Sequence, residues 1–193
     1  LRYGGNLAYP SLQGMDSGNN VIYVGTFSKS LFPGLRLGYM VVPEELVKPF
    51  SGMRFLIDRQ SNEILQMAVA EFIKTGLYET HLLKMRRIFE ARRDYLIQAV
   101  QENFGAWGKF IAAGQGMHLT FVFNNSDIND EAVADLCRRQ GVELRSISSF
   151  SIGTPLYKGL IMGFGHFPPA QLLAAVSRIG FVLRDKFAAF GPN

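Results

Sequence analysis

Residues 25–39 read GTFSKSLFPGLRLGY and connect two short apolar runs. Residues 21–24 (VIYV) are typical of a buried β-strand, and residues 39–42 (YMVV) predict a second strand. A segment rich in glycine, hydroxyl and basic side chains therefore lies between two strands. Connections of this kind are where a rigid scaffold presents binding side chains.

Lys29 is the candidate reactive group of this connection. It closely follows the first predicted strand, and we expect it to be desolvated at the end of that buried strand. Burial disfavours the ammonium form of a lysine, so that the amine is neutral part of the time. A neutral amine is the nucleophile that reacts with an aldehyde. The position of Lys29 therefore predicts attachment of an aldehyde cofactor.

Three other side chains of the same stretch are suited to a phosphate group. Thr26 and Ser28 supply hydroxyls just before the lysine. Arg36 supplies a guanidinium, whose fork of donors a phosphate accepts in bidentate fashion. We expect Gly34 and Gly38 to permit the backbone turn that brings the arginine back toward the lysine. The four polar side chains together predict a site for one phosphorylated aldehyde.

Two other motifs share parts of this pattern. A phosphate-binding P-loop would have a glycine directly before its lysine, where this sequence has Ser28. A Ser-x-x-Lys nucleophile motif would put Thr26 in the place of the serine, and its partner motifs are not found in the sequence. The simplest alternative is a surface lysine on an ordinary turn, which fits Lys29 taken alone better than it fits the whole string.

The rest of the chain predicts helices followed by a small α/β lobe. Pro43 and the two glutamates after it start a short helix, and residues 61–103 form a long helical region that is interrupted near Gly76. After Gly105 we expect strands at residues 117–123, 142–145 and 159–164 and helices at residues 129–140 and 169–187. The expected division is a part of a larger domain (1–55), bridging helices (56–104) and a C-terminal lobe (105–193).

Composition excludes several classes of protein. The 193 residues are 48% apolar and 19% charged, as in folded globular proteins, and the apolar runs are shorter than the roughly 20 residues of a membrane span. The net charge of +4 comes with no DNA-reading motif. The single Cys137 and the scattered histidines predict neither an internal disulfide nor a metal site, and they suit a reducing, cytoplasmic compartment. The chain begins at Leu1, and we expect it to be a piece of a longer protein.

The string at residues 25–39 closely resembles the cofactor-lysine segment of fold-type I, class I/II aminotransferases, which use pyridoxal 5′-phosphate (PLP). It is most similar to the aminotransferase-like domain of MocR-type regulators in the GntR superfamily. The resemblance continues through residues 58–60, 116–119 and 163–166. It implies an α/β fold, namely the end of a large mixed-sheet domain, long bridging helices and a small C-terminal α/β domain.

The same resemblance implies roles for the residues named above. Lys29 would form the Schiff base with PLP, and Thr26, Ser28 and Arg36 would hold its phosphate. An amino acid or amine would act as effector, and relatives suggest a homodimer. DNA would be read by a winged helix-turn-helix domain that residues 1–193 do not contain, and the family's partners of the pyridine ring also lie outside them.

One departure from the family pattern concerns the substrate. Aminotransferases of this type place an arginine for the substrate carboxylate where this sequence has Ile161. Arg145 and Lys158 are the candidates to replace it, although a solvated charge at a strand end explains each of them better. We therefore expect a PLP-binding effector region of a GntR/MocR-like transcription regulator. The alternatives are an active class I/II aminotransferase and a lobe that serves only in dimerisation. His81 and His118 are expected to be packed or hydrogen-bonded structural residues.

Overall fold

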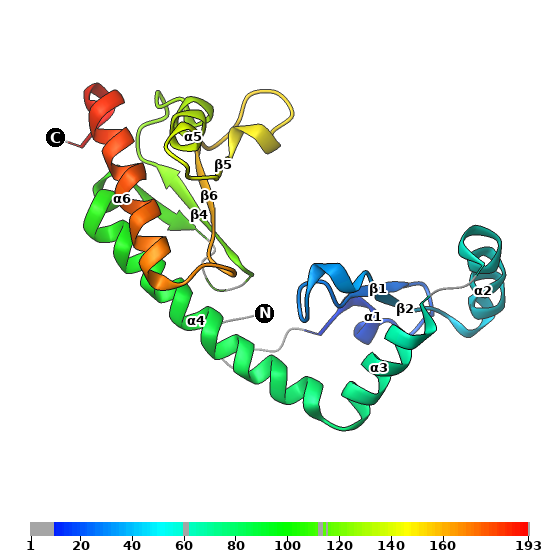
Figure 1. The fold of residues 1–193 in the computed structure, drawn as a ribbon. Helices are drawn as coiled ribbons and strands as arrows, with labels where there is room; N and C mark the ends of the chain where they lie inside the picture. The colour runs from blue at the N-terminus through cyan, green and yellow to red at the C-terminus, as the bar shows by residue number, and fades with distance from the viewer. Residues whose placement is uncertain (1–9, 60–61, 112–113, 115, 193) are drawn as a thin grey trace. The chain divides into compact units, whose positions relative to one another are not determined.

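The computed structural model describes residues 10–59, 62–111, 114 and 116–192 (Figure 1). Contacts divide them into two compact units, one with the described residues up to Lys84 and one that begins at Met85. Helix α4, Leu77–Phe104, begins in the first unit and continues into the second. The boundary between the units therefore falls inside a helix, and the three-part division expected from the sequence stays a prediction.

The first unit is built on a two-stranded antiparallel ribbon, β1 (Tyr23–Thr26) and β2 (Gly38–Val41). The pairing places Gly25 opposite Tyr39. Glycine is needed at this crossing, because a Cβ on Gly38 would come within 2.8 Å of the backbone oxygen of Gly25. Both predicted strands are confirmed, each within two residues of its expected range.

The expected burial of the first strand is wrong for the described part of the chain. Val24 is 70% exposed, and three of the four residues of β1 are exposed. Among the described residues β1 pairs only with β2, and a lone two-stranded ribbon leaves much of its surface in solvent. The apolar run predicts a strand correctly, but burial depends on neighbours that the run does not contain.

Three helices other than α4 belong to the first unit: α1 (Leu12–Met15), α2 (Glu44–Asp58) and α3 (Glu63–Lys74). The predicted short helix after Pro43 is α2, which runs for 15 residues, and none of these residues, all of them described, is buried. The predicted interruption is confirmed at Gly76, which separates α3 from α4. Its φ of +75° is a left-handed conformation that ends a helix.

The second unit combines a four-stranded antiparallel sheet with helices α4, α5 and α6 (Figure 1). The strand order is β3-β4-β6-β5, and the bounds of the elements are β3 Gly108–Ile111, β4 His118–Phe123, α5 Asp130–Arg139, β5 Arg145–Ser146, β6 Gly159–Gly163 and α6 Pro169–Lys186. The predicted elements are confirmed with two differences. The sequence does not predict β3, and the strand expected at residues 142–145 is found as the two paired residues Arg145–Ser146, so that only Arg145 lies in both.

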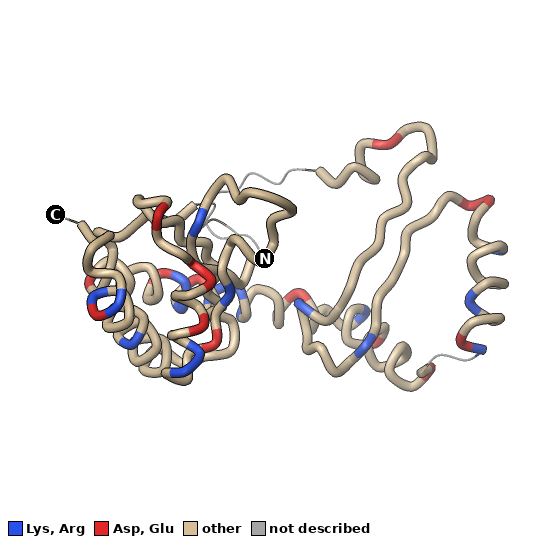
Figure 2. The backbone as a smooth tube through the Cα atoms, turned by 90° about the horizontal axis from the view of Figure 1, so that it is seen from above, with Lys and Arg blue, Asp and Glu red and all other residues tan. Residues whose placement is uncertain are grey.

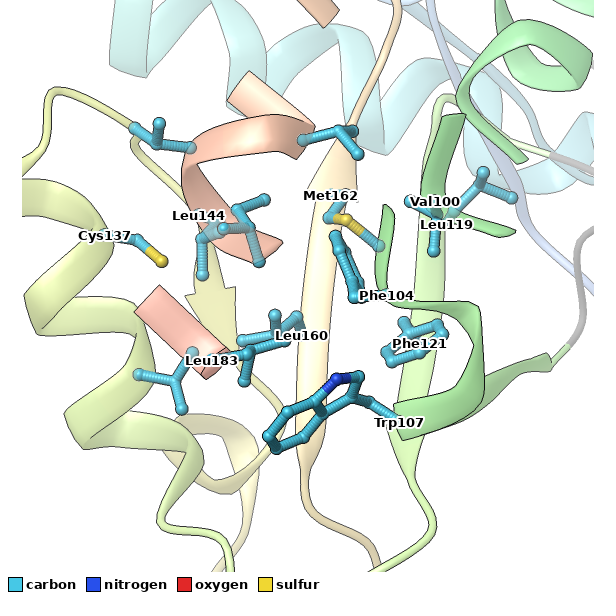
Figure 3. Close-up of a cluster of buried hydrophobic side chains, with 14 of the residues drawn as sticks. Val100, Phe104, Trp107, Leu119, Phe121, Cys137, Leu144, Leu160, Met162 and Leu183 are labelled. Carbon is cyan, nitrogen blue, oxygen red and sulfur yellow. The ribbon is translucent and has the colours of Figure 1, made fainter. Parts of the chain in front are cut away.

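The core of this unit lies between the sheet and the three helices (Figure 3). Phe121 is fully buried in β4, and the rings of Phe104, Phe110 and Phe123 lie with their centroids 5.3, 5.3 and 6.0 Å from its own. All three ring pairs meet edge to face, an arrangement that aromatic side chains favour.

Cys137 is also fully buried, and burial raises the pKa of its thiol to about 11, as expected for a packing residue rather than a reactive one.

Charged residues of both signs are interspersed along α2 to α6, and β1 and β2 carry none (Figure 2). Two arginines of the basic stretch on α4 bind groups of the protein itself. Arg92 donates to the backbone oxygen of Gly165, and Arg93 contacts the carboxylate of Asp94 at 2.7 Å.

No helix in the described part of the chain is long and apolar enough to cross a membrane.

Asp130 ties the first turn of α5 to the segment that leads into β6. The residue is 1% exposed, and its Oδ2 accepts hydrogen bonds from the backbone N–H groups of Ser148 (3.0 Å) and Gly159 (2.9 Å). Hydrogen bonds to a charged acceptor are about twice as strong as those between neutral groups. One carboxylate thus closes the connection between β5 and β6.

Asp130→Ala is expected to lower the free energy of unfolding by about 3 kcal/mol, because the buried N–H of Gly159 and the half-buried N–H of Ser148 lose their acceptor. Asp130→Asn retains one acceptor oxygen and should lose less. Urea unfolding measures both, with Glu131→Ala, an exposed residue of the same turn, as the control. An Asp130→Ala protein as stable as Glu131→Ala would contradict this role.

Candidate functional site

Thr26 is the last residue of β1, and the loop between β1 and β2 carries the other three predicted site residues, Ser28, Lys29 and Arg36. The loop has two limbs, one that follows β1 and one that leads into β2. They are joined where the N–H of Phe27 donates to the oxygen of Leu37 at 3.1 Å. On the first limb, the N–H groups of Ser30 and Leu31 donate to the oxygen of Phe27 at 3.2 and 2.8 Å. These bonds fold residues 27–31 into a tight turn, and Lys29 is the middle residue of that turn.

Thr26 connects the two limbs through its hydroxyl. Its Oγ1 accepts a hydrogen bond from the N–H of Ser28 at 3.2 Å and donates to the oxygen of Leu37 at 3.5 Å. The second bond is at the outer limit of hydrogen-bonding distance. Thr26 therefore shapes the loop between the lysine side and the arginine side.

Arg36 makes the turn that the sequence analysis assigned to glycines. A 3-10 turn at Pro33–Leu35 is anchored by the buried Leu35, and Arg36 follows it with φ 51° and ψ 32°, a left-handed conformation. The described glycines with positive φ do not include Gly34 or Gly38. The expectation for Gly34 and Gly38 is wrong in this respect, and Gly38 instead permits the close approach of the two strands.

The expected desolvation of Lys29 is wrong for the described part of the chain. Lys29, Thr26 and Arg36 are exposed, and Ser28 is half-buried. The lysine follows a ribbon that is itself exposed, so the strand cannot remove its amine from water. The four side chains nevertheless offer one amine, two hydroxyls and one guanidinium within the 11 residues 26–36, a donor set that fits an aldehyde bearing a phosphate.

A second set of residues, which the sequence analysis did not assign to the site, holds the loop at Ser30. Tyr78 donates its hydroxyl hydrogen to Ser30 Oγ at 2.8 Å, and His81 Nε2 lies 2.9 Å from the backbone oxygen of Ser30. The expectation that His81 is a hydrogen-bonded structural residue is confirmed. The sequence signal that could have identified this pair is the spacing of Tyr78 and His81, since residues three apart on a helix share a face.

Aromatic rings surround this contact. The ring of Tyr78 meets Phe27 and Phe72 edge to face, with centroids 5.9 and 6.2 Å away, and Phe72 also lies 6.2 Å from the His81 ring. On the other side, Phe27 packs against Tyr39 at 5.4 Å. A hydrogen bond with Tyr23, together with partial burial, raises the pKa of Tyr39 above its usual range.

The residues considered for a substrate carboxylate lie in the second unit. Ile161 is half-buried in β6, and the sheet register places Arg145 of β5 directly opposite it. The guanidinium carbon of Arg145 lies 5.7 Å from the centre of the Phe150 ring. The backbone oxygen of Lys158 accepts from Phe123 at 2.9 Å.

Comparison with known proteins places this geometry in a family context. The family model described as aminotransferase class I and II matches residues 2–165. The "Uncharacterized HTH-type transcriptional regulator YhdI" of Bacillus subtilis is 30% identical over 179 residues, which cover 93% of this chain and 38% of the relative. The "Probable rhizopine catabolism regulatory protein MocR" of Rhizobium meliloti is 31% identical over 180 residues, which cover 93% and 36%.

Solved structures show the same fold at lower identity. The α-aminoadipate aminotransferase LysN of Thermus thermophilus, complexed with N-(5′-phosphopyridoxyl)-L-leucine, superposes with a TM-score of 0.84 at 22% identity over 97% of this chain and 49% of that one. The chain spans less than two fifths of the length of the two regulators and about half of this aminotransferase.

The left-handed backbone at Arg36 leads to a stability prediction. A side chain with a Cβ costs roughly 1–2 kcal/mol in this conformation, whereas glycine adopts it freely. Arg36→Gly should therefore be about 1 kcal/mol more stable than Arg36→Ala. Urea unfolding of the two variants, with Lys48→Gly and Lys48→Ala in α2 as the helical control pair, measures the difference. At Lys48 the alanine variant should be the more stable one, because alanine favours a helix over glycine. An alanine variant that is also the more stable one at Arg36 would contradict the assigned conformation.

Proposed function

The chain belongs to the aminotransferase class I and II family, and from this premise we propose that it is the PLP-binding effector region of a GntR/MocR-like transcription regulator. The observation that carries the proposal is the stretch of residues 26–36, which presents one amine among groups that can donate hydrogen bonds to a phosphate. The regulators that match 93% of the chain support the regulatory part.

Each side chain of the loop has one role in this proposal. Lys29 would hold PLP covalently, because its amine in the neutral form is the group of this loop that can condense with an aldehyde. Thr26 and Ser28 donate hydroxyl hydrogens to the phosphate, and Arg36 donates a bidentate pair from its guanidinium. PLP supplies an electron sink for chemistry at an amine carbon when it is bound.

The exposure of the loop bears on how tightly these groups act. Phosphate contacts in water are weakened by competition with solvent and by salt. Lys29 and Arg36 are exposed in the described part of the chain, and that chain spans less than two fifths of the matched regulators. We therefore propose that tight PLP binding requires the intact protein rather than residues 1–193 alone.

The remaining partners are also proposals. An amino acid or amine would be the effector, because such a molecule can exchange with Lys29 on the cofactor aldehyde. A domain outside residues 1–193 would contact DNA, in keeping with the helix-turn-helix named in the matched regulators. We further propose a homodimer in the cytoplasm, as the family resemblance implies.

An active aminotransferase is the second candidate, because solved aminotransferases share the fold over nearly the whole chain. Ile161 argues against it. An isoleucine cannot form the charge-assisted, bidentate bond that an arginine gives to a carboxylate. Loss of that bond weakens orientation of an amino-acid substrate more than attachment of the cofactor.

Attachment of PLP is expected to require Lys29. The intact protein mixed with PLP should show a visible absorption band, and borohydride reduction should leave one phosphopyridoxyl group on the peptide that contains Lys29. Lys29→Ala should lose both signals, whereas Lys48→Ala, which removes an exposed lysine of α2, should keep them. No band in the wild-type protein, or equal labelling of Lys29→Ala, would exclude the proposed attachment.

Turnover separates the two candidate functions. We expect the PLP-loaded protein, supplied with an L-amino acid and a 2-oxo acid acceptor, to form no more new 2-oxo acid than Lys29→Ala does. Chromatographic quantification of the 2-oxo acid products measures this. Sustained formation that depends on Lys29 would establish the aminotransferase and overturn the purely regulatory function.

A further inference from the structure

We propose that Tyr78 and His81 are positioning residues that hold the Lys29 loop for attachment of PLP. They act on Ser30, the neighbour of Lys29, and not on the cofactor. The inference rests on the proposed function, because Lys29 must attach PLP for its position to matter. It adds two residues from a helix that is separate from the loop.

The contact engages both polar groups of Ser30 beyond its N–H. Tyr78 donates to Ser30 Oγ at 2.8 Å, and that hydroxyl in turn donates to the oxygen of Phe27 at 3.3 Å. His81 Nε2 lies 2.9 Å from the oxygen of Ser30. Two side chains of α4 and one backbone group of the loop thus fix a residue from three directions.

The proton on His81 follows from the chemistry of its partner. A backbone oxygen only accepts hydrogen bonds, so Nε2 carries the hydrogen in this contact. The neutral ring with its hydrogen on Nε2 and the charged ring both donate from that nitrogen. The contact therefore survives protonation of the ring and serves as a constant anchor.

Burial separates the anchor from the reactive side chain. Ser30, Tyr78 and His81 are half-buried, whereas Lys29 is exposed. The rings of Phe27 and Phe72 pack against Tyr78 and restrict where its hydroxyl can lie. The backbone on one side of Lys29 is held, while the amine stays free to reach a ligand.

The anchor and the two hydroxyl groups proposed for the phosphate lie on different sides of Lys29, and Arg36 takes its position from the separate turn at Pro33–Leu35. Thr26 and Ser28 precede Lys29 and are shaped by their own hydrogen bond at 3.2 Å. Ser30 follows it and depends on α4. Loss of the anchor should therefore weaken attachment of the amine more than binding of the phosphate, since preorganisation is lost only at the lysine.

Two ligands distinguish these effects in the intact protein. PLP reports attachment through its visible band, and pyridoxine 5′-phosphate, which has no aldehyde, reports phosphate binding by calorimetry. Tyr78→Phe keeps the ring and removes the hydroxyl, and His81→Leu removes the donor. Each should weaken PLP binding roughly 5-fold, the effect of one hydrogen bond, and leave pyridoxine 5′-phosphate binding within about twofold.

Conservative and distant variants complete the experiment. His81→Gln, whose amide nitrogen can donate near the position of Nε2, should recover attachment. Tyr95→Phe on α4 and His118→Leu on β4 are the controls, and both should behave as wild type. Hydrogen–deuterium exchange of the peptide spanning residues 28–32 should speed up in Tyr78→Phe and in His81→Leu only.

The outcomes separate this inference from the proposed function. If the wild-type protein attaches no PLP, the proposed function fails and the inference fails with it. If the wild type attaches PLP and the Tyr78 and His81 variants match it, only the inference is overturned. An equal loss of both ligands in these variants would also overturn it, because it would show a general structural role.

Discussion

The antiparallel pairing of β1 with β2 is the constraint on which the candidate site depends. The pairing brings the end of one strand next to the start of the other, so the residues between them must close on themselves. The bond from Phe27 to Leu37 and the Thr26 hydroxyl then hold the two limbs together. An amine on one limb and a guanidinium on the other thereby share one short loop.

Local features of this arrangement could be predicted from the sequence, and contacts between distant segments could not. The hairpin and the helix break at Gly76 are encoded within a few residues, because apolar runs and a glycine act where they stand. The anchoring of Ser30 joins residues 48 and 51 positions apart, which no local pattern specifies. The burial expected for β1 depends on strand neighbours, and the left-handed turn falls on Arg36 although two glycines flank it.

The same distinction applies to the substrate residues. The family resemblance singles out Ile161 as the place of a carboxylate-binding arginine, with Arg145 as one of two residues considered in its stead. The register adds that Arg145 is the cross-strand neighbour of Ile161. Cross-strand neighbours project from the same face of a sheet. A guanidinium is thus present beside the isoleucine, but it lies over the Phe150 ring, which gives it a packing role within this unit.

Binding a cofactor and turning over a substrate make different demands on such a loop. Attachment requires a positioned amine and a held phosphate, whereas turnover requires groups that bind the transition state better than the ground state. In the proposed function the loop supplies the first kind of group, and Ile161, where the family resemblance implies an arginine, does not supply the second. For a regulator, what matters is whether a ligand at Lys29 favours one conformation over another.

The anchor provides a contact through which such a ligand could act. Ser30 is hydrogen-bonded to Tyr78 and His81 in the first turns of α4, and α4 is one helix with residues in both units. If the proposed function holds, an effector that displaces the Lys29 amine changes the forces on a loop bonded to this helix, and the size of the response is limited by the effector's difference in affinity for the two conformations.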